Sequence, residues 1–204
     1  ASSLKVKKEL DILEEKDYLE SYNLILETAN YLSNTIDDFQ YYFSPNKNKN
    51  SFNTKNLIDK SLKLSSMEFK EHNINVIKNI EEFEALNFEN ELLQVVINIL
   101  NNAKDELIKK DAKRYIFIDL FKEDKNIIIK IKDNAGGIDK NVIDRVFEPY
   151  FTTKHKSKGT GIGLYMCQEI IVKHIEGTIQ VSNEIYEYEN EEFIGAKFEI
   201  TLAL

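Results

Sequence analysis

Cysteine, glycine and proline are all scarce in this 204-residue chain, which contains one cysteine, seven glycines, two prolines and no tryptophan. The single cysteine, Cys167, excludes an internal disulfide and a zinc site built from cysteines. No apolar run approaches the roughly 20 residues that a membrane-spanning helix needs, and the N-terminus has no signal-peptide pattern. These absences predict a cytoplasmic chain without a membrane span.

Positive charge is also in the minority, since 27 Lys and Arg residues stand against 35 Asp and Glu and give a net charge of −8. The phosphate backbone of a nucleic acid would be repelled by such a surface, so we expect no nucleic-acid partner. The hydrophobic fraction of 42% includes 12 Phe and 10 Tyr, enough for a packed core. A nucleotide would bind only where local donors or a metal ion offset its charge.

Residues 4–43 contain no glycine or proline and are predicted to form one long helix, which Pro45 ends. From Tyr18 its apolar residues recur in steps of four and three, a heptad pattern. They are Tyr18, Tyr22, Ile25, Ala29, Leu32, Ile36, Phe39 and Phe43. The length and register favour a bundle or dimer stem, with an ordinary amphipathic helix on a globular domain as the alternative.

The remainder of the chain mixes helical and strand patterns. Helices are expected at 54–70, 87–110, 139–147 and 161–177, strands at 73–80, 114–121, 125–133, 178–185 and 196–204, and a polar loop at 148–160. The pair 114–121 and 125–133 reads as a hairpin. This order predicts an α+β fold with a mostly antiparallel sheet.

Asp133 ends the strand "NIIIKIKD" on the same face as its alternating isoleucines. A carboxylate at the end of a core-facing row must find hydrogen-bond donors. Because Gly136 and Gly137 follow and allow a flat ligand to approach, this carboxylate suits an exocyclic amine such as that of adenine. An Asp that caps its own turn is an equally good interpretation of these residues alone.

Asn98 and Asn102 lie four residues apart in "NILNNA" and therefore share a helix face, beside the apolar stripe. Asn is a mediocre helix former, and amide oxygens suit Mg²⁺, which keeps waters and substrate phosphates as its other ligands. Asp105 lies about one turn further along this face. Asn residues that bond to neighbouring loops are the alternative.

The stretch 147–164 joins an aromatic anchor to a glycine cluster that opens a helix. Lys154, Lys156 and Lys158 supply charge beside His155, and Gly159, Gly161 and Gly163 follow. Such a stretch can close over a polyanion and present free N–H groups to phosphates, although a charged run is more often a solvated loop. A dinucleotide fold fits poorly because no strand precedes the glycines, and a P-loop is excluded because GxxxxGK[ST] is absent.

Four motifs, in this order and spacing, resemble the ATP-binding catalytic domain of sensor histidine kinases. "NILNNA" resembles the N box, "DNAGGI" the first glycine box, "FEPYFTTK" the F box and "GTGIGL" the second glycine box. The superfamily also includes DNA gyrase B, Hsp90 and MutL, and the resemblance covers about 85–204. It implies a two-layer α/β sandwich of the Bergerat type, with helices on one face of a mixed, mostly antiparallel sheet. The stretch 33–52 further resembles the second helix of a dimerisation and histidine-phosphotransfer stem and its linker.

The resemblance also implies roles for single residues. Asp133 would bind the adenine amine, Asn102 would hold Mg²⁺, and Asn98, Asn102 and Lys154 would serve catalysis, with Lys154 reaching the terminal phosphates. The implied nucleotide-binding residues are Asp133, Ala135, Gly137, Ile138, Phe147, Thr152, Thr153, Lys154, Gly159, Thr160, Gly161, Ile162, Gly163 and Leu164.

Three departures from the family pattern stand out. Ala135 replaces the first glycine of the D-x-G-x-G box, and Asp105 stands where some relatives carry a phosphate-binding Lys. The histidines His72, His155 and His174 do not lie on a bundle helix with the acidic neighbour that the family's acceptor has. We therefore expect the phosphoacceptor helix to precede this chain, which looks like a truncated kinase.

The predicted organisation is a stem helix at 1–46, a linker at 47–56 and an ATP-binding catalytic domain at 57–204. The resemblance implies ATP and Mg²⁺ as ligands and transfer of the γ-phosphoryl group to a histidine on a separate stem helix. The implied partners are that helix, a response regulator receiver domain and a second copy joined through the stem, in a protein that can be membrane-anchored as a whole. The alternatives are a superfamily ATPase, and a non-catalytic dimerisation or adaptor module with a relic nucleotide fold.

Overall fold

The computed structural model describes residues 49–154 and 159–204, together with a few helical positions before them. These positions are Lys16, Tyr18, Leu19, Tyr22, Asn23, Ile25, Leu26 and Ala29. Most of the predicted stem helix at 4–43, its contact with a second copy, and the lysines at 156 and 158 therefore lie outside the described residues. Within the described part, no helix is long and apolar enough to cross a membrane.

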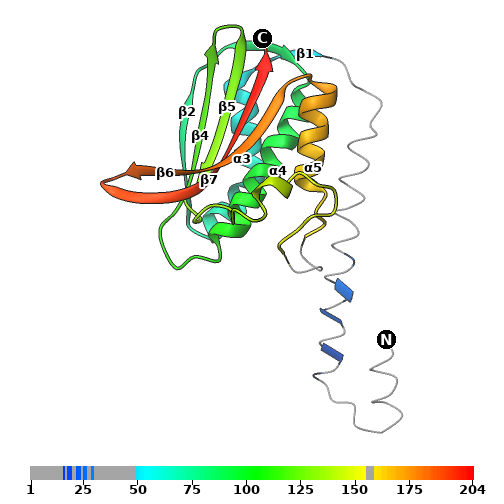
Figure 1. Cartoon of the computed structure of the whole chain (residues 1–204), viewed down its shortest axis with the longest axis vertical. Helices are drawn as coiled ribbons and strands as arrows, with labels where there is room; N and C mark the ends of the chain where they lie inside the picture. The colour runs from blue at the N-terminus through cyan, green and yellow to red at the C-terminus, as the bar shows by residue number, and fades with distance from the viewer. Residues whose placement is uncertain are drawn as a thin grey trace.

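One five-stranded sheet, covered on a single face by helices, forms the body of the described part (Figure 1). Its elements are α3 (Thr54–Glu71), β2 (Ile74–Ile80), α4 (Glu89–Leu107), β4 (Arg114–Glu123), β5 (Asn126–Asp133), α5 (Gly163–Gln168), β6 (Thr178–Tyr188) and β7 (Glu191–Ala203). The strand order is β2-β4-β5-β7-β6, and only the pair β2–β4 is parallel. The predicted α+β fold with a mostly antiparallel sheet is confirmed.

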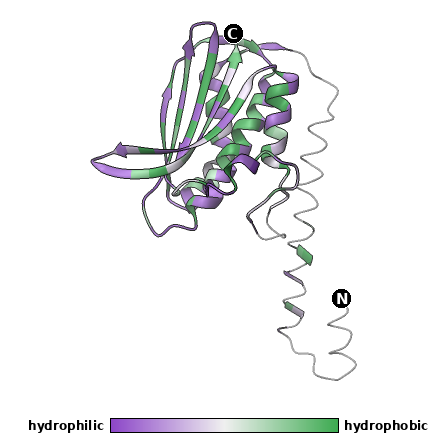
Figure 2. Ribbon diagram, viewed as in Figure 1, coloured by the Kyte–Doolittle hydropathy of each residue, from purple (hydrophilic) through white to green (hydrophobic). Residues whose placement is uncertain are grey.

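The core lies between the sheet and the helices. On β4, Ile116, Ile118 and Leu120 alternate toward the helices and are essentially inaccessible to solvent. They belong to the same buried core as Val95 and Ile99 of α4, and apolar residues recur along these strands and helices in Figure 2. Burying each such side chain contributes about 1.5–3 kcal/mol, so α4 is held firmly by its apolar face and presents its other face to the cavity described below.

Short strands and turns account for most differences from the sequence predictions. β1 (Asn50–Asn53) lies within the stretch predicted as a linker and pairs with the unpredicted β3 (Glu84–Asn87). Each has four residues, too few to show an alternating pattern. The helix expected at 139–147 is only a 3₁₀ turn at Ile143–Arg145, and the helix expected at 161–177 continues after α5 as a π-helix at Glu169–His174.

β6 and β7 extend beyond the rest of the sheet as a long hairpin, at the left of Figure 1. Its turn places Glu189 at φ 52° and Asn190 at φ 61°, the left-handed geometry of a two-residue hairpin, without the glycine that usually signals it. Ring edges meet ring faces near the turn of this hairpin. The rings are Tyr115, Phe117, Tyr186, Tyr188 and Phe193. We call them the aromatic brace.

Arg114, at the start of β4, ties the ends of two helices to the sheet. Its Nε donates to the carbonyl of Leu107 at 3.0 Å and its Nη2 to that of Lys110 at 2.8 Å, at the end of α4. Its Nη1 donates to the carbonyl of His72, just after α3, at 2.6 Å. One side chain thus satisfies carbonyls that a helix end leaves without partners.

Replacing Arg114 with Met should lower the free energy of unfolding by about 2–3 kcal/mol, because these carbonyls lose a charged donor. Denaturant titration of both proteins measures the difference. The matched control is Lys78→Met, which breaks an exposed ion pair with Asp59 and should cost less than about 1 kcal/mol. Equal losses in the two variants would contradict the anchoring role of Arg114.

Candidate functional site

A cavity of about 930 Å³ opens between α4, the loop after β5 and the segment that precedes α5. We call residues 147–163 the lid segment; residues 155–158 of it lie outside the described part. Most residues that the sequence singled out line this cavity. They are Asn98, Asn102, Asp133, Gly137, Ile138, Thr152, Thr153, Lys154, Gly159, Thr160, Gly161, Gly163 and Leu164.

Three of the predicted nucleotide-binding residues are not among the lining residues. Ala135 is buried, and its N–H donates to Asp133. Phe147 packs edge-to-face on Phe198 of β7, with ring centroids 6.4 Å apart, and Ile162 is buried at the start of α5. These side chains support the walls of the cavity and do not form its surface.

Asp133, at the end of β5, is the buried carboxylate of the cavity, with only 5% of its surface exposed. Its Oδ1 accepts the N–H of Ala135 at 2.9 Å and the N–H of Ala196 at 3.2 Å. Among the described residues no hydrogen bond engages Oδ2. Burial raises the pKa of this carboxyl to about 6, although both backbone N–H groups favour its ionised form. Asp133 therefore has one oxygen fixed by the backbone, while the other is available to a donor in the cavity.

The residues that hold Asp133 were not found by sequence reasoning. At Gly195 on β7, an added Cβ would meet the carbonyl oxygen of Asp133 at 1.5 Å, so only glycine lets these backbones approach. The hydroxyl of Tyr186 donates to that same carbonyl at 2.8 Å. The small pair Gly195–Ala196 inside an otherwise bulky strand was the available signal.

The turn after Asp133 is clamped by Asn183 of β6, another residue that the sequence did not single out. Its Oδ1 accepts the N–H of Ile138 and its Nδ2 donates to the carbonyl of Ile138, both at 2.7 Å. Gly137 has φ +79°, and a Cβ there would lie 2.6 Å from Oδ1 of Asn183. The clamp itself thus requires glycine at 137, in addition to any space that a ligand needs.

On α4, across the cavity, Asn102 and Asp105 both contact Lys154 of the lid segment. The Lys154 Nζ donates to Oδ1 of Asn102 at 3.0 Å and to Oδ2 of Asp105 at 2.7 Å. Asn98 lies one turn earlier, and its Nδ2 is buried without a hydrogen-bond partner among the described residues. A buried amide donor with no partner is costly, so it points to a ligand that completes the site.

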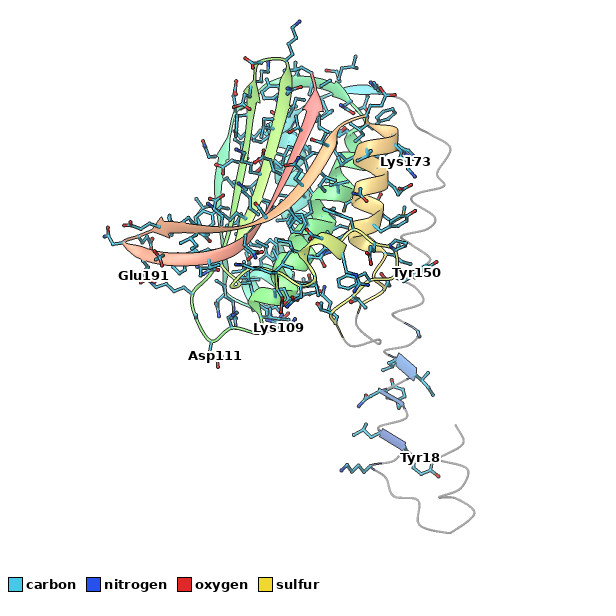
Figure 3. All side chains as sticks on the ribbon, in the orientation of Figure 1. Tyr18, Lys109, Asp111, Tyr150, Lys173 and Glu191 are labelled. Atoms are coloured by element: carbon cyan, nitrogen blue, oxygen red, sulfur yellow. The ribbon has the colours of Figure 1, made fainter. Side chains whose placement is uncertain are left out.

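The lid segment folds back on itself before α5 begins. The N–H of Tyr150 donates to the carbonyl of Gly161 at 3.0 Å. Gly161 has φ +66°, and a Cβ there would lie 2.5 Å from the backbone of Tyr150, so this turn needs glycine. The Tyr150 side chain, labelled in Figure 3, is 73% exposed. By contrast, a Cβ on Gly163 would meet only Asn98, at an ordinary 3.5 Å.

The residues present fit a nucleotide held with a divalent cation. An amide oxygen that already accepts a cationic ammonium is a suitable Mg²⁺ ligand once phosphates supply further oxygens. The described residues offer no cluster of three His, Cys, Asp or Glu side chains for a metal, so a cation would depend on the ligand's own oxygens. Asp133 and the unpartnered amide of Asn98 add an acceptor and a donor on the cavity wall.

The family model for histidine kinase-, DNA gyrase B- and HSP90-like ATPases matches residues 87–204. The chain belongs to this family. The match includes every site residue above and confirms the resemblance that the four motifs indicated. Members of this family with curated names include sensor histidine kinases, among them the signal transduction histidine-protein kinase AtoS of Escherichia coli, 35% identical over 130 residues.

That match covers 62% of this chain and 20% of AtoS, and the chain spans between about a tenth and a quarter of the curated relatives it matches. Among solved structures, Acinetobacter baumannii histidine kinase AdeS matches with TM-score 0.71 and 21% identity, covering 99% of this chain and 92% of AdeS. Histidine kinase ThkA, solved in complex with response regulator TrrA, matches with TM-score 0.67 and 21% identity, covering 94% and 53%. The fold is therefore the Bergerat-type sandwich that the sequence predicted.

Gly195→Ala should lower the free energy of unfolding by about 3 kcal/mol or more, because its methyl group would push β7 away from the backbone of Asp133. Thermal and denaturant unfolding measure the loss. Gly163→Ala is the matched control and should change stability by less than about 0.5 kcal/mol, since its methyl group has room. A stable Gly195→Ala protein would show that this close approach is dispensable.

Proposed function

We propose that residues 57–204 form the ATP·Mg²⁺-binding catalytic domain of a two-component sensor histidine kinase. The observation that carries this proposal is the geometry of Asp133, a buried carboxylate whose one oxygen is fixed by backbone N–H groups while the other is not engaged. A fixed, half-satisfied acceptor at the cavity wall suits the exocyclic amine of adenine. The triphosphate would then extend toward Asn102 and Lys154.

The proposed reaction transfers the γ-phosphoryl group of ATP to a histidine on a stem helix outside this chain. The lone pair of the acceptor nitrogen attacks the γ-phosphorus, the bond from that phosphorus to the bridging oxygen breaks, and its electrons leave on ADP. Bound Mg²⁺ supplies charge neutralisation at the phosphates. Asn102 would hold that ion, Lys154 would stabilise charge on the terminal phosphate, and the N–H groups at the start of α5 would orient the triphosphate.

Two features favour a kinase over a hydrolase. Asn98 stands at the position where the ATPases of the superfamily carry a Glu general base, and an amide cannot take a proton from water. The structure of ThkA with its response regulator supports a receiver domain as the downstream partner, which we extend to this chain as part of the proposal. We place the protein in the cytoplasm, with assembly through the stem.

The proposal predicts a pH-dependent affinity for an ATP analogue. The free protein protonates Asp133 below about pH 6, where the adenine amine loses its charged acceptor. The affinity for AMP-PNP with Mg²⁺ should therefore fall as the pH drops through 6, by about tenfold between pH 7 and pH 5. Asp133→Asn should weaken binding about ten- to a hundredfold at neutral pH and remove this pH dependence.

Calorimetry measures both effects, and Asp144→Asn, an exposed carboxylate of the 3₁₀ turn, is the matched control. Wild-type protein that does not bind AMP-PNP, or binding that Asp133→Asn leaves unchanged, would favour the adaptor alternative.

Incubation with γ-labelled ATP separates the kinase from the ATPase. This chain should bind ATP without acquiring a stable phosphohistidine, because none of His72, His155 and His174 has the setting of a family acceptor. It should transfer label only when a stem helix with an acceptor histidine is added. Steady ATP hydrolysis that disappears in Asn98→Ala would instead revive the ATPase alternative.

A further inference from the structure

The ammonium group of Lys154 contacts the oxygen that the proposed function assigns to a metal ion. It lies 3.0 Å from Oδ1 of Asn102 and 2.7 Å from Oδ2 of Asp105. Asn102 and Asp105 lie three residues apart on α4 and so share one face of the helix. Together their oxygens form a small, partly negative site that already holds one positive charge.

We propose that Asn102 Oδ1 and Asp105 Oδ2 form a single cation site that Lys154 and the divalent ion occupy in turn. The inference rests on the proposed nucleotide function. It adds that Lys154 occupies the cation site in the free protein, and that Asp105 is a second oxygen donor to this site beside Asn102. A Mg²⁺ ion coordinates its oxygen ligands at about 2.0–2.1 Å. An ammonium on the same amide oxygen would then lie within a few ångströms of a doubly charged ion, and like charges so close repel strongly.

The neighbours of Asp105 allow this exchange without leaving its carboxylate unpaired. Its Oδ1 lies 3.7 Å from Nζ of Lys104, whose shorter ion pair is with Glu68 of α3 at 2.6 Å. When Lys154 leaves, Asp105 therefore keeps Lys104 beside it. Both Lys154 and Asp105 line the cavity, so the released ammonium stays within the space where the phosphates would lie.

The exchange gives the protein two ways to neutralise a triphosphate. Without a divalent ion, Lys154 remains at Asn102 and acts as the local cation. With the ion present, the lysine moves from the amide oxygen to the phosphates. Nucleotide affinity and Mg²⁺ affinity are thus coupled through one side chain, and the coupling is reciprocal by thermodynamic necessity.

The test is calorimetric titration of the chain with AMP-PNP in EDTA and across a series of Mg²⁺ concentrations, for wild type and Lys154→Met. The variant should bind about three- to tenfold more weakly in EDTA, because the protein's own cation is gone. The Mg²⁺ concentration that gives half of the maximal increase in affinity should fall by about the same factor, because the ion meets no competitor. A lysine that only contacts phosphate would leave this half-effect concentration unchanged, and that result would overturn the proposal.

Two further variants separate a shared site from general electrostatics. Lys104→Met also removes one positive charge beside Asp105, but the Lys104 ammonium pairs with Oδ1 of Asp105 and not with the amide oxygen of Asn102. This variant should therefore lower the half-effect Mg²⁺ concentration less than Lys154→Met does. Asp105→Asn should raise that concentration, because the ion loses a carboxylate. Equal shifts in the two lysine variants, or an unchanged or lowered value in Asp105→Asn, would each overturn the shared site.

Failure of this inference is distinguishable from failure of the proposed function. Wild-type protein that binds no AMP-PNP at any Mg²⁺ concentration would overturn both. Tight, Asp133-dependent binding with the same Mg²⁺ response in wild type and Lys154→Met would overturn the shared site alone. Thermal unfolding of each variant establishes that it folds, and the surviving pair between Asp105 and Lys104 predicts little loss in Lys154→Met.

Discussion

The site depends on keeping one carboxylate, Asp133, out of water at the end of a central strand. Removing a carboxylate from water is expensive, and this cost appears as the raised pKa of Asp133. Two backbone N–H groups offset part of it, one from the turn after β5 and one from β7. Because both donors must reach the same oxygen, the turn and the neighbouring strand are fixed relative to each other. The glycine at 195 and the clamp by Asn183 follow from that requirement.

α4 then connects this fixed wall to the rest of the cavity. Its apolar face is part of the core, and Arg114 ties its end to the sheet and to the residue after α3. The polar face consequently presents Asn98 and Asn102 at positions that the packing of the opposite face determines. The packing of the apolar face thus sets the positions of the two amides to which we assign ligand binding, and the proposed reaction depends on such positioning.

The sequence predicted most of the fold and most of the residues that gather around the cavity, but not the residues that support them. Periodicity identified the long helices and the hairpin of β4 and β5, and motif spacing identified Asp133 and Asn102. Four-residue strands such as β1 carry too little pattern, and the β6–β7 turn uses Glu189 and Asn190 where a glycine would have been a signal. The contacts of Asn183 and Tyr186 with the turn after β5 span about fifty residues of chain, and no local pattern encodes such a distance.

The aromatic brace links the site to a surface well away from the cavity. Tyr186 belongs to the brace through its ring and to the support of Asp133 through its hydroxyl. The order of the hairpin extension therefore contributes to the geometry of the adenine side of the proposed site. Substitutions on this solvent-facing hairpin would therefore be able to change nucleotide affinity while every residue inside the cavity stays the same. Selection on affinity can then act on more residues than those that line the cavity.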